Sequence, residues 1–256
     1  MKKKVGFVLL AALLIGIFTV PVFGGQLFPG LNTLLEGTDE PSEVVTTLQV
    51  FFLISLIALA PSLLVLLTGF TRIIIVLSFG RQAMATQQMP PNQVLVGIAI
   101  FLTIFIMTPV FAEINENALV PFGAGELTTE EAIDAAMLPL RTWMLRQLDT
   151  DMGFGALELF HNLADVQMDG IENVPSYILI PAFIVHELMM AFIMGFLIYL
   201  PFIVIDMVVA SVLMSMGMMM LPPAMISMPF KIMVFILSGG WELLIEYLMV
   251  SFNPDY

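Results

Sequence analysis

"RIIIVLSFGRQAMATQQMPPNQVLVGIAIFLTIFIMTPVF", residues 72–111, is the stretch that decides the fold. Two apolar runs flank a more polar stretch that ends in Pro90 and Pro91. Proline has no amide proton to give to a helix, and it drives the residue before it out of the helical region. We therefore predict a first helical hairpin over residues 48–111, with its corner at Pro90–Pro91.

The second half of the chain repeats this arrangement. "IDMVVASVLMSMGMMMLPPAMISMPFKIMVFIL", residues 205–237, places Pro222 and Pro223 between two apolar runs. A second helical hairpin is expected over residues 178–256, with a methionine-rich loop just before its corner. The predicted fold is all-α: bent helical hairpins built from long apolar helices, joined by a more polar helical central segment.

Composition restricts the class of protein. Of the 256 residues, 59% are hydrophobic and only 11% are charged, whereas soluble domains carry roughly a quarter of charged residues. The net charge of −13 disfavours a nucleic-acid partner, because nucleic-acid-binding proteins present basic patches. The chain contains no cysteine, which excludes disulfides and thiolate sites. These features indicate a membrane protein or a subunit of a membrane complex.

The first 24 residues have the pattern of a secretory signal peptide. Three lysines at positions 2–4 precede an apolar stretch, and small residues follow at Gly24 and Gly25. We expect cleavage near Gly24; the alternative is a first membrane helix that is retained. In both cases the polar segment over residues 25–47 would lie outside the cytoplasm.

Four uncharged runs are long enough to cross a bilayer as helices. Cytoplasmic loops are enriched in Lys and Arg, so the connection containing Arg72 and Arg81 is predicted to face the cytoplasm. The acidic segment 112–177 would then face the opposite side. The sequence by itself predicts four simple spans, at residues 48–67, 94–111, 188–205 and 207–230.

The acidic central segment, residues 112–177, is predicted to be helical. Its twelve acidic residues are accompanied by only two arginines, Arg141 and Arg146. Thr128 or Thr129 followed by acidic residues is typical of a helix start. An apolar stripe at helical spacing follows the cap and predicts packing against another helix; it consists of Met137, Leu140, Met144, Leu145 and Leu148.

Three ionisable residues stand in apolar surroundings: Glu187, Asp206 and Lys231. Isolated charges at membrane depth are costly, and by default they indicate functional sites. We expect Glu187 to pair with Lys231, within the chain or between subunits. The alternative is a pair that only fixes helix register, and Asp206 could equally be an interfacial acid.

No pattern typical of an enzyme is present. The sequence "HELMM" at 186–190 has Met190 where a zinc-binding motif needs a second histidine. Nucleophile elbows and phosphate-binding glycine loops are also missing from the sequence. We therefore expect no catalytic residues, no metal and no cofactor.

Residues 72–111, together with "FIMGFLIYLPFIVIDMVVASVLMSMGMMMLPPAMISMPFKIMVFILSGGWELL" at 192–244, resemble the FliP family. The family provides a core subunit of the flagellar type III export gate, and its virulence-secretion relatives are called SctR. The resemblance covers almost the whole chain after the signal peptide. It implies a ring-forming subunit whose bent hairpins pack against other subunits, so that the four simple spans are not expected in the complex.

The resemblance also implies partners and a location. Members form a pentamer, join FliQ and FliR, and dock with FlhB and FlhA in contact with membrane lipid. Unfolded flagellar export substrates pass through the central channel. The implied location is the flagellar basal body in the bacterial inner membrane, largely on its periplasmic side.

A methionine-rich loop narrows the channel in this family and is described as a gasket. Met218, Met219 and Met220 match that loop, and Met216 extends it. The resemblance also matches Glu187 and Lys231, which Arg141 or Arg146 would join in an intersubunit charge network. The alternative for the methionines is gap-filling between helices.

Two other classes of protein fit the composition. A polytopic small-molecule or ion transporter, or a channel, would also have broken helices and charges at mid-membrane. It would bind its substrate as an isolated chain. A structural scaffold would form the ring without methionines facing the lumen.

Overall fold

The computed structural model describes residues 65–86, 88–164, 170, 174–218 and 222–252, together with single residues between positions 51 and 62. The chain divides into two compact units, residues 1–64 and residues 65–256, and the helices discussed below belong to the second unit. The predicted signal peptide and the polar segment at 25–47 lie outside the described residues.

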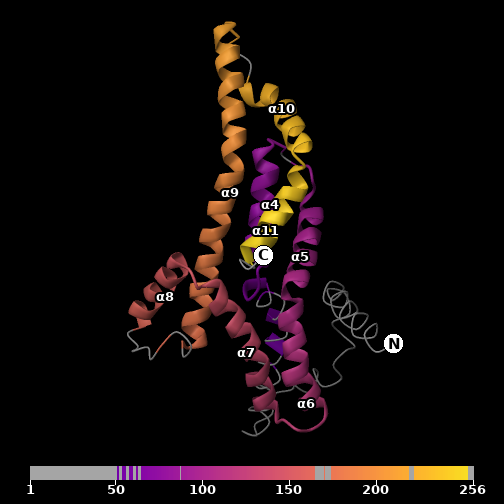
Figure 1. Ribbon diagram of the computed structural model, residues 1–256, viewed down its shortest axis with the longest axis vertical. Helices are drawn as coiled ribbons and strands as arrows, with labels where there is room; N and C mark the ends of the chain where they lie inside the picture. Colours follow the sequence, from indigo (N-terminus) through magenta and orange to yellow (C-terminus); the bar gives the residue numbers. More distant parts are fainter. Residues whose placement is uncertain are drawn as a thin grey trace, which may run out of the picture. The chain divides into compact units, whose positions relative to one another are not determined.

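The prediction of an all-α fold is confirmed, since the described residues form helices and no strand. Figure 1 shows the helices in their spatial order. In chain order they are α4 (Phe70–Ala83), α5 (Asn92–Ile114), the π-helical turn η1 (Asn115–Leu119), α6 (Val120–Gly123), α7 (Thr129–Gln147), α8 (Asp151–Ala164), α9 (Ser176–Ser215), α10 (Pro223–Leu237) and α11 (Gly240–Phe252).

Helix α9 is the longest element, with 40 residues, and it packs against α4, α7, α8 and α10. Asp206 lies inside this helix, so the runs at 188–205 and 207–215 form one element where the sequence suggested a separation. A single carboxylate interrupts the apolarity of a run but leaves the backbone hydrogen bonds of the helix intact. Pro181 and Pro201 also lie inside α9 without ending it.

The described residues include three of the four apolar runs that the sequence suggests as spans, and these runs are arranged differently in the helices. Among the described residues, two helical stretches are long and apolar enough to cross a bilayer, Asn92–Gly123 and Ser176–Ser215. A third is obtained if α10 and α11, which meet at a bend of 65°, are taken together as one span. The first apolar run, at 48–67, lies mostly outside the described residues.

The hydrophobic core is centred on α4, which packs against α5, α9 and α11. Ile73, Val76 and Leu77 of α4 are completely buried. At Gly195 of α9, an added Cβ atom would lie 2.4 Å from the ring of Phe79 on α4. This glycine therefore permits the close approach of α4 and α9.

The start of α7 confirms the predicted cap. The Thr128 hydroxyl accepts a hydrogen bond from the Glu131 amide at 3.3 Å, and the Glu131 carboxylate accepts one from the Thr128 amide at 2.8 Å. The bond from the Thr128 backbone, followed by the bond from its hydroxyl, lowers the pKa of Glu131 below its ordinary value. From the predicted apolar stripe, Met144 and Leu148 are fully buried.

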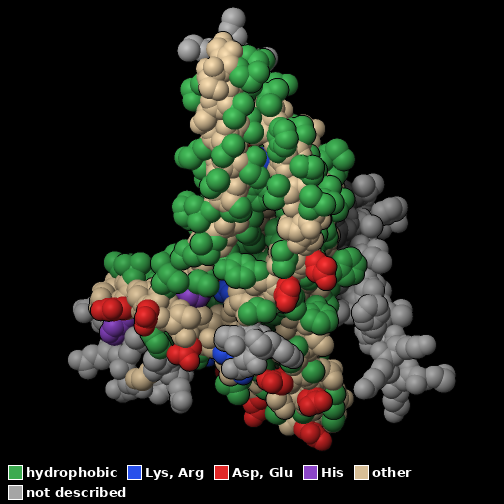
Figure 2. Space-filling view, turned by 45° about the horizontal axis from the view of Figure 1, so that its top comes forward, with side chains coloured by type: hydrophobic (Ala, Val, Ile, Leu, Met, Phe, Trp, Pro, Cys, Tyr) green, Lys and Arg blue, Asp and Glu red, His purple; other side chains and the backbone are tan. Residues whose placement is uncertain are grey.

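Large hydrophobic side chains remain exposed on the single chain, above all on α9 and α10. Figure 2 shows them covering this part of the molecule, while the acidic side chains gather away from it. Examples along α9 and α10 are Phe196, Val204, Met207, Met225, Ile236 and Leu237. Surfaces of this kind mark contacts with lipid or with other protein chains.

Candidate functional site

A buried ion pair between Arg72 of α4 and Glu187 of α9 lies in the core. Both side chains are only 1% exposed. The Arg72 Nε donates to one carboxylate oxygen of Glu187 at 3.0 Å, and Nη2 donates to the other oxygen. This two-pronged geometry is the strongest that an arginine and a carboxylate can form.

The remaining guanidinium donors of Arg72 reach two further helices. Nη1 donates to the backbone oxygen of Ser251 at 2.9 Å, and Nη2 lies 3.5 Å from the side-chain oxygen of Gln147. Gln147 in turn donates to the backbone oxygen of Phe252 at 3.1 Å, and the ring of Phe252 lies against the guanidinium group. One arginine thus connects α4, α7, α9 and the C-terminal end of α11.

The sequence analysis assigned Arg72 to a connection between spans, and the structure places it in the first turn of α4 instead. Its charge is neutralised inside the protein, so it does not contribute to the charge of a loop. Arg81 is then the basic residue near the corner, where it donates to the Asn92 side chain and to the backbone oxygen of Pro90. The signal for a buried arginine was present, since five apolar residues follow Arg72 directly.

A second charge cluster joins α9 to α10. The Lys231 ammonium group lies 2.5 Å from one carboxylate oxygen of Asp206, and the Ser227 hydroxyl donates to the other at 2.5 Å. The side chain of Lys231 is 3% exposed and that of Asp206 is 35% exposed. We call this cluster the hairpin clamp: Asp206, Ser227 and Lys231.

The expected pair of Glu187 with Lys231 is therefore wrong within the chain. Glu187 and Asp206 are both on α9, and nineteen residues of helix separate them by about 28 Å. Lys231 can reach only one of the two acids, and the fold brings it to Asp206. The stranded charges were recognised from the sequence, but their partners depend on the register between helices.

Arg141 of α7 uses its donors within the chain. It donates to the Ser176 hydroxyl at 2.6 Å and to the backbone oxygen of Val174 at 2.5 Å. These bonds fix the start of α9 against α7. An intersubunit role for Arg141 remains a prediction.

The methionine-rich loop begins with a Schellman motif at the end of α9. The Met218 amide donates to the Leu213 oxygen at 3.0 Å, and the Gly217 amide donates to the Met214 oxygen at 3.1 Å. This motif requires a residue with positive φ, and Gly217 provides it with φ of +74°.

Two methionines beside this motif are exposed. Met216 is 67% exposed and Met218 is 40% exposed on the single chain. Met219 and Met220 lie outside the described residues. The Pro222–Pro223 pair stands at the beginning of α10, and the Pro90–Pro91 pair immediately precedes α5.

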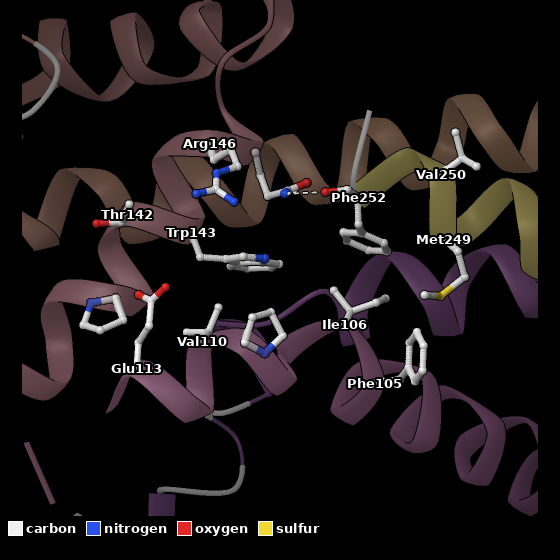
Figure 3. A pocket seen from close by; sticks show the side chains of 13 residues that line it. Phe105, Ile106, Val110, Glu113, Thr142, Trp143, Arg146, Met249, Val250 and Phe252 are labelled. Atoms are coloured by element: carbon white, nitrogen blue, oxygen red, sulfur yellow. Dashed lines mark hydrogen bonds between the residues drawn. The ribbon is translucent and has the colours of Figure 1, made fainter. Parts of the chain in front are cut away.

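Sequence reasoning missed a cleft of about 750 Å³ between α5, α7 and α11. Figure 3 shows Thr142, Glu113 and Arg146 toward one end of it and Phe105, Met249 and Val250 toward the other. The cleft forms only where α11, from the end of the chain, meets α5 and α7, so local patterns could not have found it. Among the described residues, no group of His, Asp and Glu side chains is suited to hold a metal ion.

Comparison with known proteins gives consistent matches over most of the chain. A family model described as "FliP family" matches residues 53–248. A "Flagellar biosynthetic protein FliP" of Bacillus subtilis (strain 168) is 48% identical over 219 residues, which is 84% of this chain and 96% of the relative. The protein of the same description from Pectobacterium carotovorum subsp. carotovorum is 44% identical, covering 92% of this chain and 90% of the relative. That from Aquifex aeolicus (strain VF5) is 41% identical, covering 82% and 87%.

Proposed function

Because this chain belongs to the FliP family, we propose that it is the core pore-forming subunit of the flagellar type III protein export gate. Its matched relatives are flagellar biosynthetic proteins. In this proposal the chain lines a channel through which unfolded export substrates cross the bacterial inner membrane. The proposal assigns no catalytic step to the chain.

The observation that carries the proposal concerns the described part of the methionine-rich loop, which directly follows α9. Met216 and Met218 are exposed on the single chain, although methionine is an apolar residue that proteins usually bury. In a ring of five copies, Met216, Met218, Met219 and Met220 would converge on the central axis. A flexible, polarizable thioether can repack around irregular shapes, and an apolar constriction excludes water and ions.

The hairpin clamp supports this role because it fixes α10 against α9 close to the loop. Lys231 and Asp206 pair directly, and Ser227 occupies the second carboxylate oxygen. A displaced α10 would move the loop from its place on the axis. The clamp therefore acts as a positioning device, and the methionines form the seal.

The partners in the proposal are further copies of this chain, FliQ, FliR, FlhB and FlhA, and unfolded flagellar export substrates. The exposed apolar faces of α9 and α10 provide surface for such subunits and for membrane lipid. The proposed location is the flagellar basal body, largely on the periplasmic side of the inner membrane.

The test is a triple variant in which Met218, Met219 and Met220 are changed to Ala. We expect the gate to assemble with its partner subunits and to leak small ions, because the shorter side chains leave the constriction open. Ion conductance across the inner membrane is measured in cells that produce the assembled gate.

The matched control changes Met225, Met228 and Met233 of α10 to Ala. It removes the same number of methionines outside the loop, and we expect a tight gate. A loop variant that assembles and stays as tight as this control would exclude the gasket role.

A further inference from the structure

We propose that the cleft between α5, α7 and α11 binds a phospholipid with a zwitterionic phosphoethanolamine head group. The cleft binds the head group at its polar end and the first part of an acyl chain along α5. This inference goes beyond the export role and does not depend on it.

The cleft has an apolar floor. Val110 of α5, Trp143 of α7 and Phe252 of α11 are buried side chains that line it. The polar floor residue, Gln147, donates to the Phe252 backbone and lies next to Arg72, so its amide is already engaged. The floor therefore fits hydrocarbon and gives a polar ligand nothing to bind.

The side chains change character along the cleft. Exposed apolar residues, among them Phe105 and Val250, form the end that lies along α5 and α11. Thr142, Glu113 and Arg146 are at the other end (Figure 3). An apolar end and a polar end within one cleft match the build of an amphiphile.

The polar end carries one charge of each sign. Arg146 of α7 and Glu113 of α5 both line the cleft, and within the described part of the chain neither has an ion-pair partner. A phosphate beside Arg146 and an ammonium group beside Glu113 would satisfy both residues at once. A purely anionic head group carries the same phosphate charge but no ammonium group, so it would leave the Glu113 carboxylate beside a negative charge and without a partner. A free fatty acid would also leave Glu113 without a partner.

The surroundings favour a lipid. The apolar wall belongs to the stretch Asn92–Gly123, one of the two that are long and apolar enough to cross a bilayer. The volume of the cleft falls within the range of roughly 300–1,000 Å³ that is usual for small-molecule sites. The remainder of the acyl chains would lie along Phe101, which is 74% exposed.

The experiment uses the full chain, purified in detergent, with native mass spectrometry of bound lipid. The probes are dioleoyl phosphatidylethanolamine and dioleoyl phosphatidylglycerol, added separately and in competition. We expect the unmodified chain to prefer phosphatidylethanolamine by about fivefold, the factor typical of one charge contact near a membrane surface.

Two variants test the charges. Glu113→Gln should abolish the preference for phosphatidylethanolamine over phosphatidylglycerol, because the ammonium group of phosphatidylethanolamine then has no carboxylate to bind. Arg146→Gln should weaken the binding of both lipids, because both contain the phosphate. Glu116→Gln, which neutralises an exposed acid of η1 outside the cleft, is the matched control and should change nothing.

Two results would overturn the proposal. Equal lipid binding by Glu113→Gln, Arg146→Gln and Glu116→Gln would show that the lipid is only part of the general detergent and lipid layer. A photo-reactive residue at position 105 that crosslinks to a second copy or another protein, and never to lipid, would show that a protein chain occupies the cleft.

Discussion

Arg72 connects four helices through one buried side chain. A buried charge is costly unless its donors and acceptors are all satisfied. Here the carboxylate of Glu187, the backbone end of α11 and the ring of Phe252 surround the guanidinium group. The cluster therefore links α4 to α7, α9 and α11, from which these partners come.

Changing Glu187 to Ala should destabilise the chain strongly, because Arg72 then keeps its charge in the core without a counter-charge. Loss of one partner of a buried pair costs about 3–5 kcal/mol. The measurement is thermal unfolding of the purified chain in detergent. The double variant Arg72→Met/Glu187→Met is the control, and we expect it to be more stable than Glu187→Ala. Equal unfolding temperatures for the two variants would contradict this explanation.

Residue types could be predicted from the sequence better than residue partners. Glu187, Asp206 and Lys231 stand out because each interrupts an apolar run. Arg72 was misplaced in a connection, since a sequence does not show where a helix begins when apolar residues lie on both sides. The partners followed from the register of α4 and α10 against α9, which is a property of tertiary packing.

At the scale of elements, the α9–α10 hairpin combines a helix end, a loop and a clamp. The Schellman motif ends α9, and the hairpin clamp joins α9 to α10 through residues on either side of the loop. These two devices fix both sides of the methionine loop independently. Variants of either should therefore have separable effects.

Gly217→Ala should destabilise the end of α9, because Gly217 has φ of +74° and a side chain is strained there. The left-handed conformation costs an L-residue about 1–2 kcal/mol. Gly97→Ala is the matched control, since Gly97 lies in α5 with open space around it, and Ala favours a helix. The unfolding temperature should fall for Gly217→Ala, and for Gly97→Ala it should stay unchanged or rise. A fall of the same size in both variants would exclude the proposed role of the Schellman motif.

Lys231→Ala should impair assembly of the proposed gate before it alters the proposed pore, because Asp206 loses its partner and α10 is released from α9. The measurement is co-purification of the partner subunits with the tagged chain. Asp206→Ala/Lys231→Ala removes both charges and should recover part of the assembly. Normal assembly of the Lys231→Ala variant would show that the clamp is dispensable.

The helical nature of each element could be predicted, and the lengths of the elements could not. Periodic apolar residues and the Thr128 cap identified α7, and the double prolines indicated where α5 and α10 begin. The position of a charge did not predict the length of a helix, because Asp206 interrupts the apolar run but α9 continues through it. Its carboxylate is accommodated by the clamp, which involves two residues of another helix, Ser227 and Lys231.

At the scale of the whole chain, the exposed apolar surface of α9 and α10 dominates the described unit. Together with the proposed ring, this surface implies that the single chain is one subunit of a larger assembly. The cleft beside α5 is also a property of the whole chain, because its walls come from α5, α7 and α11 and only the folded chain brings them together. Sequence patterns report one helix at a time, so neither feature could be predicted in detail.

The thermal stability of the purified chain should depend on its concentration, because association covers the apolar faces of α9 and α10. Any partner that binds the folded state alone raises the unfolding temperature by mass action. The measurement is a series of unfolding curves at tenfold dilutions in a fixed detergent concentration. The control introduces Glu at Val204 and Ile236, which are exposed on the single chain. We expect this variant to lose the concentration dependence, and curves that never shift with dilution would contradict association through this surface.

The Arg72 cluster also has a consequence for biosynthesis. The ribosome adds Arg72 115 residues before Glu187 and 179 residues before Ser251. At a synthesis rate of roughly 5–20 residues per second, the arginine waits about 10–35 s for its last partner. During this interval a charged side chain stands in an apolar segment that is already leaving the ribosome. The nascent chain therefore needs water, a lipid head group or the insertion machinery around Arg72 until its own C-terminus arrives.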